Sequence, residues 1–111
     1  MKYRKGDIVW VDFPFTDGSQ SKPRPAMIIS NSKVNRTGDY LLIMITSKIK
    51  KDNLSVEMKN SDYHNKPLEI RSFIRLHKIF IINETLILGK KTSVKKDFYS
   101  KILQGIFKIM K

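Results

Sequence analysis

Residues 7–30, DIVWVDFPFTDGSQSKPRPAMIIS, contain two apolar segments separated by a polar one, and they decide the fold class. The first segment, Asp7 to Phe13, is rich in β-branched and aromatic residues, which is typical of a β-strand. The segment after it carries Pro, Asp-Gly and Ser, the residues of turns and loops. Ala26 to Asn31 is again apolar enough for a central strand. The chain therefore begins as strand, loop and strand.

Arg24 stands between two prolines where the second strand begins. Each proline fixes its own φ and pushes the preceding residue toward extended geometry, so the backbone of Arg24 has little freedom. The pattern indicates that the guanidinium is held in a defined direction. The same residues also fit a proline-started edge strand that carries an ordinary solvated arginine.

The rest of the sequence predicts more strands and one terminal helix. Further strands are expected at Tyr40 to Thr46, Leu54 to Met58, Glu69 to Leu76 and Lys78 to Ile82, the last two being candidates for one long bent strand. From about Val94 to the end, apolar residues recur at helical spacing. Thr92 or Ser93 is the expected N-cap of this helix, and Gly105 weakens its last turns.

This order of elements predicts a mainly β protein, a small and strongly bent sheet or barrel followed by a C-terminal amphipathic helix. One domain is expected over residues 1–111, because no linker or repeat divides the chain. We expect the single glycines Gly6, Gly18, Gly38 and Gly89 to lie in turns.

The amino-acid composition indicates which classes of partner the protein can bind. The chain has 22 Lys and Arg against 10 Asp and Glu, a formal net charge of +12, and this positive field attracts polyanions. Nucleic acid is the first partner to consider, and an acidic protein is also compatible; a membrane is not expected, because the apolar side of the terminal helix is needed for the core. The absence of cysteine excludes disulfides and thiolate metal sites, and the N-terminal sequence does not resemble a signal peptide, so a cytoplasmic protein is the expectation.

Three segments in order, KGDIVWVDFPFTDGSQSKPRPAMIIS, LLIMITSKIK and SFIRLHKIF, followed by the amphipathic helix, resemble the MazF/PemK family of toxins. These are the toxin halves of type II toxin–antitoxin pairs. The resemblance implies an SH3-like β-barrel, a homodimer, and an endoribonuclease that cleaves single-stranded RNA at a short preferred sequence without metal or cofactor. It also implies a cognate acidic antitoxin that blocks the RNA groove.

RNA cleavage of this kind uses the 2′-hydroxyl as nucleophile, so the protein has to move two protons and stabilise an anionic phosphate. Arg24 matches the arginine of the family's RP motif, and a guanidinium suits the phosphate because its donors form a planar fork. Thr46 matches the family's functional threonine, whose hydroxyl can donate to a phosphate oxygen. An alternative for Thr46 is a strand-end residue with a locally satisfied hydroxyl.

Arg75 and His77 are the candidates for proton transfer. In one branch of the family an arginine and an aspartate two residues later are proposed as acid and base, and here histidine replaces the aspartate. An imidazole can both accept and donate a proton, and residues i and i+2 of a strand share a face. The alternative is an exposed polar stripe on an edge strand.

The segments 14–22 and 48–53 are expected to form the walls of an RNA-binding groove. The candidate RNA-binding residues lie in these segments or directly next to them, and they are Phe15, Gln20, Lys22, Ser47 and Lys48. Gln20 stands near the place where family members often carry a glutamate, and it cannot act as a base. Trp10 is expected in the core or at a dimer contact, and His64 on the surface. With two distant histidines and no cysteine, no metal site is expected.

Two other functions remain open on the residues alone. Related toxins poison DNA gyrase by binding it, and a basic module can bind RNA without cleaving it. Neither function requires Arg24 or Thr46 to act in catalysis. Cell toxicity that survives Arg24→Ala would therefore favour the gyrase-poison alternative.

Overall fold

The computed structural model describes residues 2–13 and 22–111. The described residues form a single six-stranded antiparallel sheet in the order β4-β5-β3-β2-β1-β6. The strands are β1 (Asp7–Phe13), β2 (Lys22–Ile28), β3 (Asp39–Thr46), β4 (Ser55–Met58), β5 (Ser72–Asn83) and β6 (Ile87–Ser93). The helices are α1 (Ser32–Asn35) and α2 (Lys96–Ile109), with two 3₁₀ turns, η1 (Asn60–Asp62) and η2 (Glu84–Leu86).

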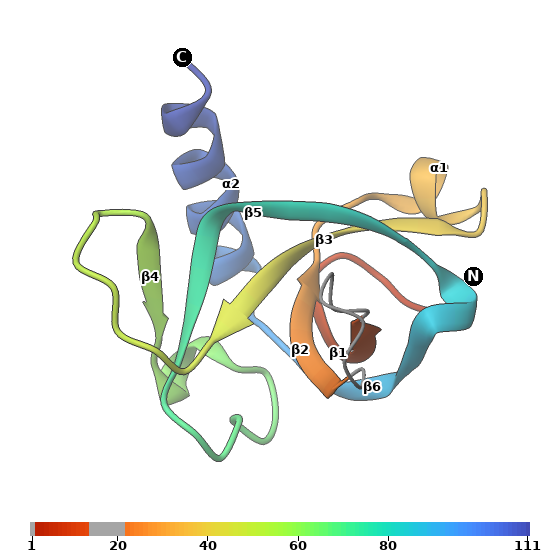
Figure 1. Cartoon of the computed structure of the whole chain (residues 1–111), viewed down its shortest axis with the longest axis horizontal. Coiled ribbons are helices and arrows are strands. Elements are labelled where there is room, and N and C mark those ends of the chain that lie inside the picture. The colour runs from red at the N-terminus through yellow and green to blue at the C-terminus, as the bar shows by residue number, and fades with distance from the viewer. Residues whose placement is uncertain (1, 14–21) are drawn as a thin grey trace.

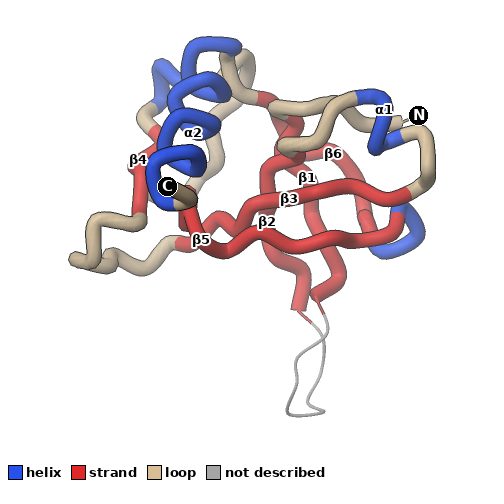
Figure 2. The backbone as a smooth tube through the Cα atoms, turned by 90° about the horizontal axis from the view of Figure 1, so that it is seen from above, coloured by secondary structure: helices blue, strands red, loops and turns tan. Residues whose placement is uncertain are grey.

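The sheet curls strongly, as Figure 1 shows for β5, β3, β2, β1 and β6, so that β5 and β6 approach each other through η2. Within the described residues, the sheet does not close into a barrel by hydrogen bonds, and β4 and β6 are its two edge strands. Figure 2 shows α2 lying beside the sheet at the β4 end, while α1 lies toward the other end. The predicted mainly β fold, with a bent barrel-like sheet and a C-terminal helix, is confirmed.

Both faces of the sheet are buried, which explains the continuous apolar sequence of its central strands. Neighbouring residues of one strand enter two different clusters: Ile8 packs with Met27 and Ile43 on the α2 side, whereas Val9 packs with Leu42 on the inside of the curl. Side chains alternate across a strand, so each face takes every second residue. The long apolar stretches of β2 and β3 therefore supply two cores at once.

Helix α2 packs on the sheet through Phe98, Tyr99 and Ile102. The Tyr99 hydroxyl donates to the carbonyl oxygen of Ile29 at 2.6 Å and ties the helix to the end of β2. A Cβ at Gly105 would lie 3.0 Å from Leu76 Cδ2, so glycine allows the helix to approach β5 closely. Gly105 therefore serves packing, and the helix continues past it to Ile109.

Two expectations about local structure are wrong. Strand β6 occupies Ile87–Ser93, which the sequence did not predict, and Gly89 lies inside this strand rather than in a turn. Thr92 and Ser93 belong to β6, and the N-cap of α2 is Lys95, which has no side-chain capping bond. The segments Glu69 to Leu76 and Lys78 to Ile82 form the single strand β5, so the alternative of one long bent strand is confirmed.

Gly6 and Gly38 do lie in turns with positive φ, as expected, while Gly18 lies outside the described residues. Within residues 2–13 and 22–111, no helix combines the length and the apolar character that a membrane crossing requires.

Candidate functional site

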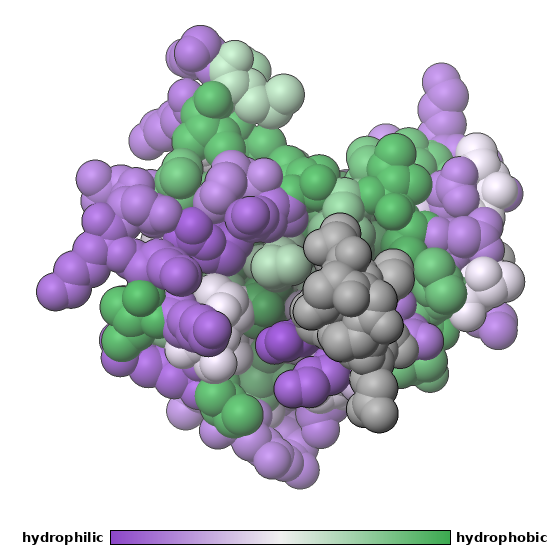
Figure 3. Space-filling view, in the orientation of Figure 1, coloured by the Kyte–Doolittle hydropathy of each residue, from purple (hydrophilic) through white to green (hydrophobic). Residues whose placement is uncertain are grey.

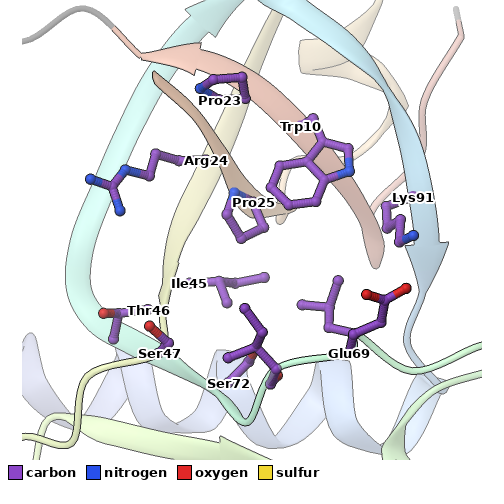
Figure 4. Close-up of a pocket in the computed structure, with 12 residues that line it drawn as sticks. Trp10, Pro23, Arg24, Pro25, Ile45, Thr46, Ser47, Glu69, Ser72 and Lys91 are labelled. Carbon is purple, nitrogen blue, oxygen red and sulfur yellow. The ribbon is translucent and has the colours of Figure 1, made fainter. Parts of the chain in front are cut away.

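A pocket of about 290 Å³ opens between the first residues of β2, the end of β3 and the loop that precedes β5. Figure 4 shows that its polar side chains form two groups. Arg24, Thr46 and Ser47 lie on one side, and Glu69 and Lys91 lie on the other. The wall between these groups is largely apolar, with Trp10, Pro25 and Ile45 as its main contributors.

The two prolines of β2 shape this pocket. Residues Lys22 to Pro25 pair with β1, but the ladder from β2 to β3 begins only at Ala26. Proline has no backbone N–H to donate, so Pro23 and Pro25 cannot extend that ladder toward β3. Arg24 is exposed on this segment and lines the pocket. Strand β2 is central in the sheet, so the edge-strand alternative is wrong, although its first residues, Lys22 to Pro25, pair with β1 alone.

Thr46 is the last residue of β3 and lies half-buried in the wall of the pocket. Its Oγ1 accepts a hydrogen bond from the backbone N–H of Lys48 at 3.1 Å. This bond uses an oxygen lone pair and leaves the hydroxyl hydrogen for a second partner. The local bond fixes the position of the hydroxyl, and the hydroxyl can still donate into the pocket.

A second hollow of about 330 Å³ shares Thr46 with the first pocket as a lining residue. Arg75 and His77 line it together with Lys50, Asp52 and other residues. The β3–β5 ladder is irregular here: Ile43 pairs with Ile79 while Ile45 pairs with Ile74, so residues 75–78 form a bulge. The bulge brings both Arg75 and His77 to the hollow, although Arg75 is buried and His77 is exposed.

Arg75 is held by an acidic partner. Its two terminal nitrogens donate to Asp52 Oδ1 and Oδ2 at 2.9 and 2.8 Å, and Nη1 also donates to Ser55 Oγ at 2.8 Å. These hydrogen bonds hold the pKa of the Asp52 carboxyl far below its usual value, and they raise the pKa of the guanidinium. Both groups therefore stay charged, and Arg75 has a fixed orientation beside His77.

The structure thus brings Arg24, Thr46 and Ser47 together, and it joins Thr46 to Arg75 and His77 through the second hollow. Lys22 and Lys48 are exposed nearby and are not among the residues that line the two hollows. Phe15 and Gln20 lie outside the described residues. His64 is exposed, as expected.

Trp10 does not lie in the core, because its side chain is half-buried and lines the first pocket, and the alternative of a dimer contact stays a prediction. In the second hollow, Lys50 and Asp52 belong to the segment 48–53 that is expected to wall an RNA groove. In the first pocket, Glu69 and Lys91 are not among the residues predicted for the site. They come from segments far apart along the chain, and no spacing in the sequence indicates their proximity. Across the described part of the chain, no three His, Asp or Glu side chains gather closely enough to hold a metal ion.

Residues 4–110 match the model of a family described as the PemK-like, MazF-like toxin of type II toxin–antitoxin systems. The chain belongs to this toxin family. The match covers both hollows and the whole described sheet. No curated protein sequence matches the chain.

Solved structures share the fold at low sequence identity. The MazE–MazF complex (Form-II) from Deinococcus radiodurans has a TM-score of 0.81 and 18% identity, over 99% of this chain and 96% of that chain. An endoribonuclease in complex with its cognate antitoxin from a mycobacterial species has a TM-score of 0.79 and 19% identity, over 97% and 94% of the two chains. The Mycobacterium tuberculosis toxin MazF-mt6 gives 0.70 and 13%, over 94% and 95%.

Proposed function

We propose that this toxin-family chain is a metal-independent endoribonuclease that cleaves single-stranded messenger RNA and so stops translation and growth. The observation that carries the proposal is the position of Thr46, which lines one pocket with Arg24 and a second hollow with His77. A strand of RNA that passes over Thr46 meets a phosphate-binding arginine on one side and a proton-transfer group on the other. The net charge of +12 favours such a polyanionic substrate.

The cleavage step requires three groups. The 2′-oxygen loses its proton and attacks phosphorus, the bond to the 5′-oxygen breaks, and that oxygen gains a proton, which leaves a 2′,3′-cyclic phosphate and a 5′-hydroxyl. Arg24 and the Thr46 hydroxyl donate to the phosphate oxygens as negative charge develops on them. His77, exposed in the second hollow, accepts or donates the proton.

Arg75 takes a different part in this proposal from Arg24. Its donors are engaged by Asp52 and Ser55, so it supplies a fixed positive charge next to His77 and does not release a proton. Ser47 and Lys48 follow Thr46 and contact the RNA backbone, with Lys22 adding positive charge at the rim.

We further propose a homodimer and an acidic antitoxin as partners. Figure 3 shows apolar side chains over α2, and exposed apolar residues also occur on β5 and β6. They include Ile79, Ile81, Leu88, Leu103, Phe107 and Met110. Apolar surface of this kind suits a protein partner. Sedimentation equilibrium of the purified chain should give the mass of two chains, and the mass of one chain would contradict the dimer.

The test of cleavage uses a long single-stranded RNA and purified protein in excess EDTA. We expect cuts at a few defined sites and product ends with 2′,3′-cyclic phosphate. Thr46→Val, which keeps the shape of the side chain and removes the hydroxyl, should lower the rate about tenfold or more, whereas Thr46→Ser should retain most of it. Binding of RNA without cutting would reject the proposal.

A further inference from the structure

We propose that the Trp10 end of the first pocket binds a guanine base of the RNA, next to the phosphate held by Arg24 and Thr46. The base stacks on the Trp10 indole, the Glu69 carboxylate accepts hydrogen bonds from the base edge, and the Lys91 ammonium donates one. This inference rests on the proposed function, because it takes RNA as the ligand of the pocket.

The Trp10 indole has an open flank. In the β1–β6 ladder, Trp10 lies opposite Gly89, so the residue paired with it has no side chain that could cover the ring. A Cβ built at Gly89 would meet nothing within 4 Å, which shows open space at this point. On the other side Trp10 lies opposite Pro25, which also lines the pocket. A half-buried ring with one open side is a stacking surface for a nucleobase.

Glu69 and Lys91 stand near this ring with no role in holding the fold. Both are exposed, and both lie on the side of the pocket away from Arg24 (Figure 4). In the part of the chain that the structure describes, neither side chain has a hydrogen-bond or ion-pair partner. By contrast, the neighbouring Lys90 pairs with Asp7 at 3.3 Å. The donors and acceptors at this end are therefore left for a ligand.

The carboxylate of Glu69 is unexpected in the RNA-binding pocket of a strongly basic protein, because a carboxylate repels the phosphates of RNA. An ionised carboxylate can only accept hydrogen bonds. It therefore selects a base edge that carries donors, and the cost of its charge is offset when two donors engage its two oxygens.

Guanine is the base whose Watson–Crick edge carries two adjacent donors, N1–H and the N2 amine, next to the acceptor O6. The carboxylate of Glu69 matches the two donors, and the ammonium of Lys91 matches O6. Adenine and cytosine offer one donor group beside acceptors, and uracil offers one N–H between two carbonyls. The combination of an aromatic face, a carboxylate and an ammonium therefore favours guanine.

Trp10 is the one tryptophan of the chain, so its fluorescence reports directly on stacking. We expect guanosine 3′-monophosphate to quench the emission with a dissociation constant about tenfold lower than those of the adenosine, cytidine and uridine monophosphates. Inosine 3′-monophosphate, which lacks the N2 amine, should bind nearly as weakly as these. Glu69→Gln should remove the preference for the guanine nucleotide. Asp97→Asn makes the same change of charge at an exposed position of α2 and should leave the preference unchanged.

The same preference should appear in RNA cleavage. Mapped sites should share a guanine at one fixed position, and inosine at that position should slow the wild type about tenfold and leave Glu69→Gln unaffected. Equal quenching by all four nucleotides, or cleavage at sites with no common guanine, would overturn the inference. Selective binding of the guanine nucleotide by a protein that cuts no RNA would support the base pocket and reject the ribonuclease.

Discussion

Arg24 and Arg75 line the two hollows that share Thr46, but the fold treats them differently. Arg24 is exposed on a proline-flanked segment that pairs with one neighbouring strand. Arg75 is 7% exposed, and its guanidinium is held by Asp52 and Ser55. The difference teaches that an arginine in a functional motif acts through its exposure as well as its charge. In the proposed function, Arg24 binds the phosphate and Arg75 fixes the structure beside it.

The largest effect on activity is expected for Arg24→Ala. Removal of a preorganised donor to the phosphate should lower the cleavage rate about 10³-fold, whereas the chain should remain folded. Single-turnover cleavage and thermal unfolding measure the two effects. Arg36→Ala, an equal loss of charge at an exposed position outside both hollows, serves as the control. Equal activity in the two variants would remove Arg24 from the site.

His77→Gln should lower the cleavage rate about 10²-fold, because a glutamine can keep a hydrogen bond but cannot transfer the proton. The pH–rate profile should also lose one limb, which a purely structural role of His77 would not cause. His64→Gln changes the other, exposed histidine and should leave the profile unchanged. A variant profile that keeps both limbs would show that another group transfers the proton.

Arg75→Ala should lower the stability of the fold. The variant loses a buried side chain, its bond to Ser55 and the pair with Asp52, and we expect the melting temperature to fall by roughly 5 °C. The comparison is Arg71→Ala, which breaks the exposed pair with Glu57 and should have a clearly smaller effect. If both variants melt alike, the Asp52–Arg75 pair does not support the fold.

The smallest expected effect is on the pH dependence of the melting temperature, and it is predicted for Asp52→Asn. Arg75 holds the pKa of Asp52 below that of the unfolded chain, where an aspartate titrates near about 3.9. A depressed folded pKa stabilises the protein above the unfolded value, and the stabilisation is lost as pH falls below it. Asp52→Asn should therefore melt below the wild type at pH 7, and the gap should narrow between about pH 5 and pH 2. A gap that stays constant would contradict this linkage.

Much of the sheet could be predicted from the sequence. Strands β1 and β3 have long apolar or β-branched segments, because both of their faces are buried. Strand β6 was missed because ILGKKTS combines a glycine with two lysines, and only part of it faces the core. The glycine lies opposite Trp10, a cross-strand relation that the sequence does not contain.

Part of the lining of the first pocket could be predicted from local sequence, and the rest of it is brought together only by the fold. The RP motif and the end of β3 indicated Arg24 and Thr46, and the structure places both in one pocket. Glu69 and Lys91 reach the same pocket from a loop and from β6, so only the tertiary structure reveals them. Similarly, the Asp52 partner of Arg75 comes from the segment expected to wall an RNA groove.

The most direct test of cleavage by the 2′-hydroxyl replaces one ribose of the RNA with 2′-deoxyribose. An RNA oligonucleotide that contains a mapped cleavage site is compared with the same oligonucleotide carrying 2′-deoxyribose at the nucleotide before the cut, both in excess EDTA. Cleavage by attack of the 2′-hydroxyl predicts that the first is cut and that the second is bound with similar affinity and remains intact. Cleavage of the deoxy-substituted strand at the same bond would contradict the mechanism assigned to the pocket of Arg24 and Thr46.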